Sequence, residues 1–218
     1  CIRDSVYSVL NEAAMSTSNR SGAADVGAMA AAMSRFLEAA GLDAEAAGDS
    51  PERYAKAWAG ELLDGYGTEP AVALEGTFDQ SPGSVVSLSA VPFVSLCSHH
   101  LLPFFGQAHL AYQPSDRLVG LGSLETLVRC LSRRLQLQEK LGDEIARALV
   151  EHLGARGAAC ILEAEHLCVF ARGGRQRGPV TRTTAFAGDL ADDPVFQQQC
   201  LILLGNPPAA PGHEEHEE

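Results

Sequence analysis

Thiol and imidazole side chains gather at two places in the chain, and both are ligand types that zinc prefers. The first place is the run 97–100 (CSHH), at the end of an apolar segment. Its C-x-x-H spacing fits a turn around one metal ion. The second place is the run 166–168 (HLC). Because residues two apart share one face of an extended strand, we expect His166 and Cys168 to point the same way.

Cys97, His100 and Cys168 would supply three ligands and leave a fourth coordination position open for water, which is the pattern of a catalytic zinc. His99 and His166 are further histidines beside them. Two alternatives fit the same residues: a structural zinc that takes a fourth ligand from these histidines, and cysteines and histidines that are simply buried. The spacing does not choose among them, because a single C-x-x-H is a weak signal.

The pair Gln138-Glu139 lies between two predicted helices and could recognise a purine. A carboxylate accepts two parallel hydrogen bonds. Guanine presents a ring N–H beside an exocyclic amine, so Glu139 together with Gln138 could read this edge of the base. The alternative is a solvated pair at the start of a helix, where the helix dipole favours acidic groups.

Basic residues are concentrated in one part of an acidic chain. Residues 129–182 hold ten of the sixteen Lys and Arg residues and only six acids, although the net charge of the chain is -12. The net charge argues against a nucleic-acid binder, whereas the local basic segment suits a small anionic ligand. Within it, the loop from Arg172 to Arg182 could bind phosphate through the planar fork of arginine. A solvated hairpin loop is the alternative for these residues.

The elements that must position these residues follow from hydrophobic periodicity and turn signals. Two helices are expected first, then two strands, two amphipathic helices, two strands and a short helix. Their ranges, in this order, are 27–40, 50–63, 85–91, 106–112, 124–135, 141–153, 158–171, 179–187 and 193–204. A hairpin, a helical pair and a second hairpin predict an α+β domain with its helices on one face of an antiparallel sheet.

Length and composition limit the class of protein further. A chain of 218 residues can bury a core without disulfides, and no apolar run approaches the length of a membrane-spanning helix. No secretory signal is visible, so the six cysteines predict a reduced, cytoplasmic protein. We expect a flexible extension over 1–24, a helical segment over 25–80, a catalytic domain over 81–205 and a disordered acidic tail over 206–218.

Several collinear motifs resemble those of the GTP cyclohydrolase I family. The resemblance covers about residues 27 to 203, and it raises the prediction of a catalytic zinc above its alternatives. The motifs are SPERYAKAW at 50–58, CSHHLLPF at 97–104, GQAHLAY at 106–112, Gly120-Leu121, RRLQLQE at 133–139, EAEHLC at 163–168 and Arg172-Gly173.

The resemblance implies a tunnelling fold, in which a four-stranded antiparallel sheet carries two helices on one face and is preceded by N-terminal helices. It also implies a homodecamer of two pentamers with active sites between subunits. The implied activity is a zinc-dependent opening of the imidazole ring of GTP at C8, which releases formate and forms 7,8-dihydroneopterin triphosphate. The implied site residues are Cys97, His100 and Cys168 for Zn²⁺, His99 and His166 for proton transfer, Gln138 and Glu139 for guanine, and Arg53, Lys56 and Arg172 for phosphate.

The chain departs from the family pattern beside the expected phosphate site. Ser98 stands where the family has Glu, and Gly122, Ser123 and Thr126 stand where Ser, Lys and Arg are usual. Two alternatives therefore stay open: an enzyme for a purine nucleotide with fewer phosphates or a modified base, and a catalytically silent oligomeric binding protein. A zinc deaminase is disfavoured, because its paired H-x-E and P-C-x-x-C motifs do not occur together.

Overall fold

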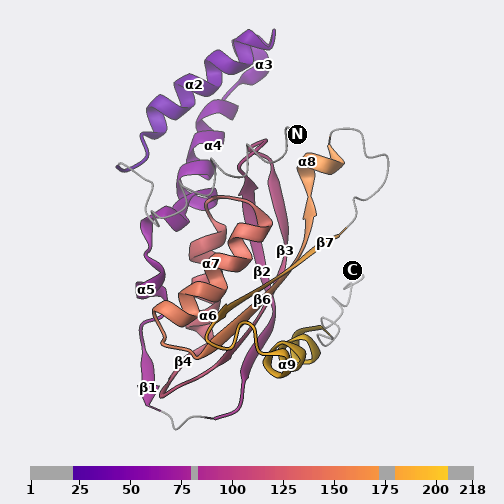
Figure 1. Cartoon of the computed structure of the whole chain (residues 1–218). Coiled ribbons are helices and arrows are strands. Elements are labelled where there is room, and N and C mark those ends of the chain that lie inside the picture. The colour runs from indigo at the N-terminus through magenta and orange to yellow at the C-terminus, as the bar shows by residue number, and fades with distance from the viewer. Residues whose placement is uncertain (1–21, 80–82, 172–179, 206–218) are drawn as a thin grey trace, which may run out of the picture. The chain divides into compact units, whose positions relative to one another are not determined.

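The computed structural model describes residues 22–79, 83–171 and 180–205 (Figure 1). The chain divides into two compact units, Cys1–Glu69 and Pro70–Glu218, which are described separately. This division lies before the predicted boundary between residues 80 and 81, and the predicted domain limits stay a prediction. Within the described ranges, every helix is too short or too polar to cross a membrane.

The described part of the N-terminal unit is helical, as the alanine-rich sequence predicts. Asp25 caps the first helix, where its carboxylate accepts a hydrogen bond from the Ala28 amide at 2.9 Å. A second helix was expected with Ser50 as its N-cap, but the cap is Asp49 and Ser50 is the first helical residue. The elements are α2 (Val26–Ala39), α3 (Ala44–Ala47), α4 (Ser50–Ala57), the π-helix η1 (Trp58–Leu62) and the 3₁₀-helix η2 (Asp64–Gly67).

The C-terminal unit is a mixed α+β structure. It comprises α5 (Pro70–Ala73), β1 (Thr77–Asp79), β2 (Val86–Cys97), β3 (Pro103–Gln113), β4 (Arg117–Val119), α6 (Leu121–Ser132), β5 (Leu135–Gln136), α7 (Gln138–Glu151), β6 (Gly157–His166), α8 (Leu167–Phe170), β7 (Thr181–Gly188) and α9 (Pro194–Gly205). The long strands β2, β3, β6 and β7 are antiparallel neighbours in this order. The antiparallel pairing of four strands was predicted, whereas their order in the sheet was not. The short strand β5 extends this sheet by a parallel pairing with β2, and β1 pairs with β4 in a second, small sheet. Neither feature was predicted.

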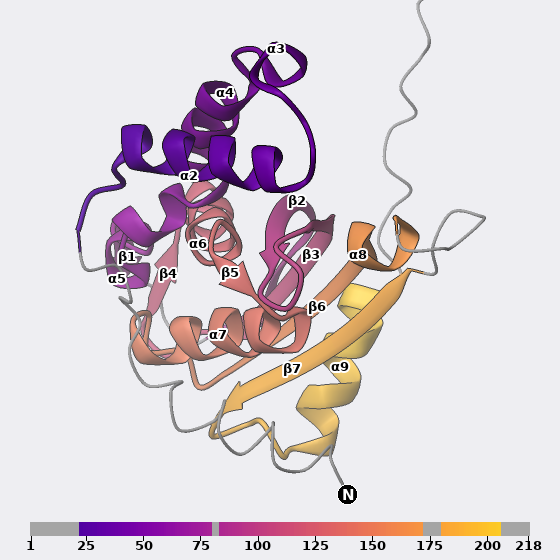
Figure 2. The ribbon, with the colours of Figure 1, turned by 90° about the horizontal axis from the view of Figure 1, so that it is seen from above.

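Different helices cover the two faces of the main sheet (Figure 2). Helices α6 and α7 cover one face, where Leu124, Leu127 and Ile145 pack against strand residues such as Leu110 and Leu162. This is the helical pair predicted from the apolar stripes. Alternate strand residues point the other way, and there Ala111, Ala159 and Ile161 pack against Phe196, Cys200 and Leu204 of α9.

The predicted strand over 158–171 is too long. Strand β6 ends at His166, and Leu167–Phe170 forms the helical turn α8, closed by a hydrogen bond from the Ala171 amide to the Leu167 carbonyl at 2.8 Å. The physical reason is the length of the neighbouring strand, because Phe104–His166 is the last residue pair between β3 and β6. The expectation that His166 and Cys168 share a strand face was therefore wrong.

Gly106 allows β3 and β6 to approach each other closely. A Cβ atom at this position would lie 2.8 Å from the Ala164 Cα and closer still to the Glu163 carbonyl oxygen. Both are backbone atoms that cannot rotate away, so we expect Gly106→Ala to lower the free energy of unfolding by about 3 kcal/mol. Urea denaturation measures this loss. The control is Gly122→Ala, where nothing lies within 4 Å of the new Cβ, and an equal loss in both variants would contradict the prediction.

His109 is a buried imidazole whose protonation opposes folding. Its Nδ1 accepts a hydrogen bond from the Ala90 amide at 3.2 Å, at a β2 residue with a left-handed φ of 61°. Burial is the main cause that lowers the pKa of His109 below 6.5, with Arg182 acting in the same direction and Glu163 against it. The unfolded chain therefore binds the proton more tightly, and stability is lost as the pH falls below about 6.5 toward the lowered pKa.

This pH dependence is measurable in a variant that keeps the acceptor. We expect His109→Gln to remove one component of the acid destabilisation, with a slope of at most about 1.4 kcal/mol per pH unit for one proton. Urea denaturation of both proteins between pH 8 and pH 5 tests this. Parallel stability profiles for the two proteins would mean that His109 does not titrate on unfolding.

Candidate active site

The turn between β2 and β3 brings His100 back over Cys97. Cys97 is the last residue of β2, and its carbonyl accepts hydrogen bonds from the amides of His100 at 3.3 Å and Leu101 at 2.8 Å. Leu101 has a left-handed φ of 57°, which closes the turn. As a result, the Cys97 sulfur lies 3.9 Å from the His100 Nδ1.

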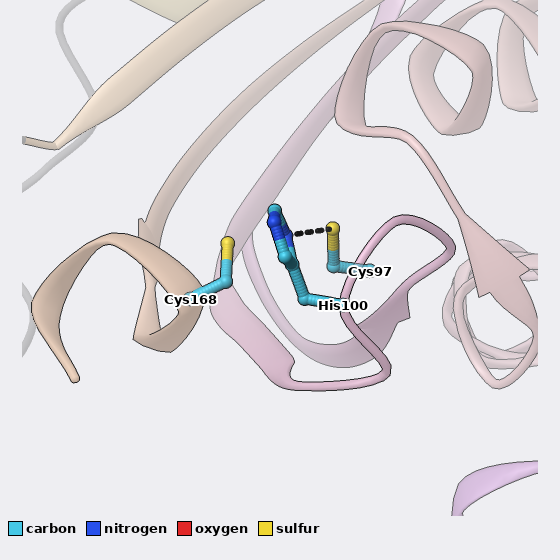
Figure 3. A group of neighbouring side chains, drawn as sticks. All are labelled: Cys97, His100 and Cys168. Atoms are coloured by element: carbon cyan, nitrogen blue, oxygen red, sulfur yellow. Dashed lines mark hydrogen bonds between the residues drawn. The ribbon is translucent and has the colours of Figure 1, made fainter. Parts of the chain in front are cut away.

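Cys168 completes a group of three possible metal ligands (Figure 3). It projects from α8 toward the turn, and the ligand atoms of Cys97, His100 and Cys168 all lie within 4.8 Å of one another. With Zn–S bonds of about 2.3 Å, two sulfurs on a tetrahedral zinc lie about 3.8 Å apart. Two buried thiols and one exposed imidazole therefore fit Zn²⁺ after a small closure.

His99 lies beside this group without belonging to it. Its ring is exposed and stands nearly perpendicular to the His100 ring, with 6.1 Å between the ring centroids. His100 thus contributes a ligand atom to the group, whereas His99 does not belong to it and is accessible to a ligand in solution.

His166 is held by two contacts. Its ring stacks on Phe104, with 4.9 Å between centroids and 3° between planes. Its Nε2 lies 2.7 Å from the Gln138 Oε1. Burial lowers the pKa of His166, although the negative charge of Glu139 acts in the opposite direction. Partial burial thus favours the neutral imidazole, the form that can accept a proton.

Gln138 and Glu139 begin α7, but their side chains have different surroundings. Gln138 is 2% exposed, and its Nε2 donates hydrogen bonds to the carbonyls of Leu162 and Thr181, both at 3.0 Å. Both amide hydrogens are therefore used within the protein. Glu139 is exposed in the first turn of the helix, where its carboxylate can accept hydrogen bonds from a ligand.

Two of the predicted phosphate-binding cations lie in the N-terminal unit. Arg53 and Lys56 are three residues apart on α4, so they share one face of this helix. Both are exposed, and Arg53 forms an ion pair with Asp49. Arg172 and most of the loop to Arg182 lie outside the described residues. The phosphate-binding role of all three cations stays a prediction.

The sequence did not single out two residues that position this group. Phe104 supports the His166 ring, and the Gln136 carbonyl accepts a hydrogen bond from the Ser98 amide at 3.0 Å. Phe104 lies outside the predicted strand 106–112, so the sequence offered no signal for its contact with the His166 ring. Gln136 lies in a two-residue strand, too short to give a periodic signal.

Three positions that depart from the family pattern, Gly122, Ser123 and Thr126, lie in the first turns of α6 and carry no cation. Ser123 donates a hydrogen bond from its hydroxyl to the Glu75 carbonyl at 3.2 Å, and Thr126 donates one to the Gly122 carbonyl at 2.8 Å. Both hydroxyls are thus already used on backbone carbonyls. Glu125, between them, is exposed.

Comparisons with known proteins agree on one family. A family model described as GTP cyclohydrolase I matches residues 29–204. A protein of Streptococcus agalactiae serotype Ia named GTP cyclohydrolase 1 is 39% identical over 179 residues, which are 81% of this chain and 95% of that protein. A protein of the same name from Streptococcus thermophilus is 40% identical over 79% of this chain and 94% of its own length.

A solved structure gives a much weaker likeness. The crystal structure of the archaeosine synthase QueF-Like in the apo form matches 50% of this chain and 97% of its own, with 16% sequence identity and a TM-score of 0.40.

Proposed function

Because the chain belongs to the GTP cyclohydrolase I family, we propose that it is a zinc-dependent hydrolase that opens the imidazole ring of GTP at C8, releases formate and forms 7,8-dihydroneopterin triphosphate. The observation that carries this proposal is the convergence of Cys97, His100 and Cys168, three zinc-type ligands from two distant segments. The alternative of cysteines and histidines that are simply buried does not account for three ligand atoms within 4.8 Å of one another.

Cys97, His100 and Cys168 would hold the Zn²⁺. When bound to two thiolates and an imidazole, zinc supplies an activated water for attack on C8. The exposed side of His100 leaves room for the nucleotide to approach.

The neighbouring side chains would bind the base and move protons. Glu139 accepts hydrogen bonds from the N1–H and the exocyclic amine of guanine, which fixes the base beside the start of α7. His99 is exposed and donates a proton to N7, which makes C8 more electrophilic. His166 exchanges a proton with the ribose as its ring opens.

We propose phosphate-binding roles for Arg53, Lys56 and Arg172 because the family resemblance implies them. A second candidate substrate is a purine nucleotide with fewer phosphates. It is favoured by the first turns of α6, where Ser123 and Thr126 offer no positive charge. The remaining alternative is a catalytically silent binding protein, and measured turnover of a nucleotide would exclude it.

The finer fold and assembly follow from the same family membership. We propose a tunnelling fold and a homodecamer of two pentamers, with active sites completed between subunits. Sedimentation of the full chain tests the stoichiometry. A cytoplasmic location fits the free thiols of all five cysteines within the described residues.

Turnover of a nucleotide panel tests the proposed function. The zinc-loaded full chain is incubated with GTP, GDP, GMP and guanosine, and the products are identified by mass together with released formate. We expect formate and 7,8-dihydroneopterin triphosphate in equal amounts from GTP. Faster turnover of GDP or GMP would favour the second candidate, and a zinc-loaded protein that releases no formate from any of them would contradict hydrolysis.

A further inference from the structure

The side-chain amide of Gln138 is fixed in one orientation by three partners. Leu162 and Thr181 both present carbonyl oxygens to the Gln138 Nε2 at 3.0 Å. A carbonyl oxygen only accepts hydrogen bonds, and a carboxamide has two N–H donors. Rotation of the amide by 180° would place its oxygen against both carbonyls, so the nitrogen must lie on this side and Oε1 on the other.

The Gln138 Oε1 therefore faces the His166 Nε2 as an acceptor, at 2.7 Å. Because an amide oxygen cannot donate, this hydrogen bond requires a proton on Nε2. In a neutral imidazole only one ring nitrogen carries a proton. The hydrogen bond thus selects the tautomer in which Nε2 is protonated and Nδ1 has the free lone pair.

Phe104 fixes the plane of the His166 ring. Its ring is fully buried and parallel to the His166 ring, with 3° between their planes. Within this plane, a 180° flip of the imidazole would exchange Nε2 for a carbon and break the hydrogen bond to Gln138. Stacking and hydrogen bonding together leave one orientation and one tautomer.

We infer that Gln138 is a positioning residue that holds His166 in the Nε2–H tautomer and so makes Nδ1 the nitrogen that exchanges a proton with the substrate. This inference rests on the proposed function, in which His166 transfers a proton. From the sequence, Gln138 was expected to bind guanine together with Glu139. As a positioning residue it has a different role, because both hydrogens of the Gln138 amide are already used within the protein.

The tautomer is measured directly in the zinc-loaded full chain with ¹⁵N-labelled histidine. The resonances of His166 are assigned by their loss in His166→Asn. We expect one set of signals for His166, with a protonated Nε2 and an unprotonated Nδ1. A protonated Nδ1 in the unsubstituted neutral ring would overturn the inference, whether or not any variant folds.

Two matched variants separate positioning from structural support. Gln138→Met keeps the length of the side chain and removes its hydrogen bonds, so we expect mixed tautomers at His166. We also expect kcat to fall about 10- to 100-fold, because general acid–base catalysis as a whole contributes roughly 10² to 10⁴, while KM for GTP changes less than about twofold. The control is Gln136→Met, which removes an equally buried amide that bonds the Leu131 carbonyl and Glu144 instead.

The outcomes are distinct. Gln136→Met should leave the His166 tautomer as in the unsubstituted chain, and mixed tautomers in both variants would overturn the inference as a general loosening of the fold. A raised KM with unchanged kcat in Gln138→Met would assign Gln138 to guanine binding and overturn it as well. The tautomer signals need no turnover, so a chain that fails to convert any nucleotide contradicts the proposed function without changing this readout.

Discussion

Cys168→Ser is expected to remove most of the bound zinc and nearly all turnover of GTP. Among the described residues, Cys168 is one of the three side chains that would hold the ion, and a serine hydroxyl is a much weaker zinc ligand than a thiolate. Loss of a partner that merely supports a ligand costs roughly 10- to 100-fold in metal affinity or activity. We expect the loss of a ligand itself to exceed this range in both quantities.

Metal analysis and formate release, measured on the same preparation, test this expectation. The control is Cys160→Ala, because Cys160 is fully buried in β6 and packs in the core, where burial raises the pKa of its thiol well above the usual range. This variant should lose stability and keep its zinc. Full zinc content in Cys168→Ser would mean that the three side chains do not form the metal site.

Glu139→Gln is expected to lower kcat/KM for GTP by about 10² to 10⁴, while zinc content stays unchanged. The carboxylate would accept two hydrogen bonds from guanine, and hydrogen bonds to charged groups contribute about 1.5–3 kcal/mol each. A glutamine in its place offers one acceptor and turns a donor toward a donor of the base. Both the lost hydrogen bond and the new donor clash act on guanine binding.

Steady-state kinetics with GTP measures the loss, and ITP serves as a second substrate because hypoxanthine lacks the exocyclic amine. We expect the preference for GTP over ITP to shrink in Glu139→Gln. The control Glu151→Gln removes an exposed carboxylate from the other end of α7 and should leave kcat/KM within about twofold. An undiminished preference for GTP in Glu139→Gln would show that another group reads the base.

The elements that the sequence predicted well are those with repeated local signals. The apolar stripes gave the helical pair α6 and α7, and the C-x-x-H spacing gave the turn that joins Cys97 and His100. The ligand types of the two segments already grouped Cys168 with Cys97 and His100, and the resemblance favoured this group over its alternatives. The local structure around Cys168 was predicted wrongly as a strand. The end of a strand depends on the length of the neighbouring strand as well as on its own residues.

Contacts between distant segments were beyond sequence reasoning. The Gln138 amide bonds residues 24 and 43 positions away, and no periodicity relates these positions. The same holds for β5, whose two residues pair with the end of β2. A solvated Gln138-Glu139 pair was the local alternative, and it describes the exposed Glu139 but not the buried Gln138.

The short segment 135–139 connects the two ends of this site. The Gln136 carbonyl accepts a hydrogen bond from the Ser98 amide in the turn after Cys97. Three residues later, Glu139 is exposed to solvent. A shift of α7 along its axis would therefore act on the turn after Cys97 through this hydrogen bond. In the proposed site, base preference and metal retention would therefore be coupled through this segment, and moving α7 to change the nucleotide selectivity would also weaken metal binding.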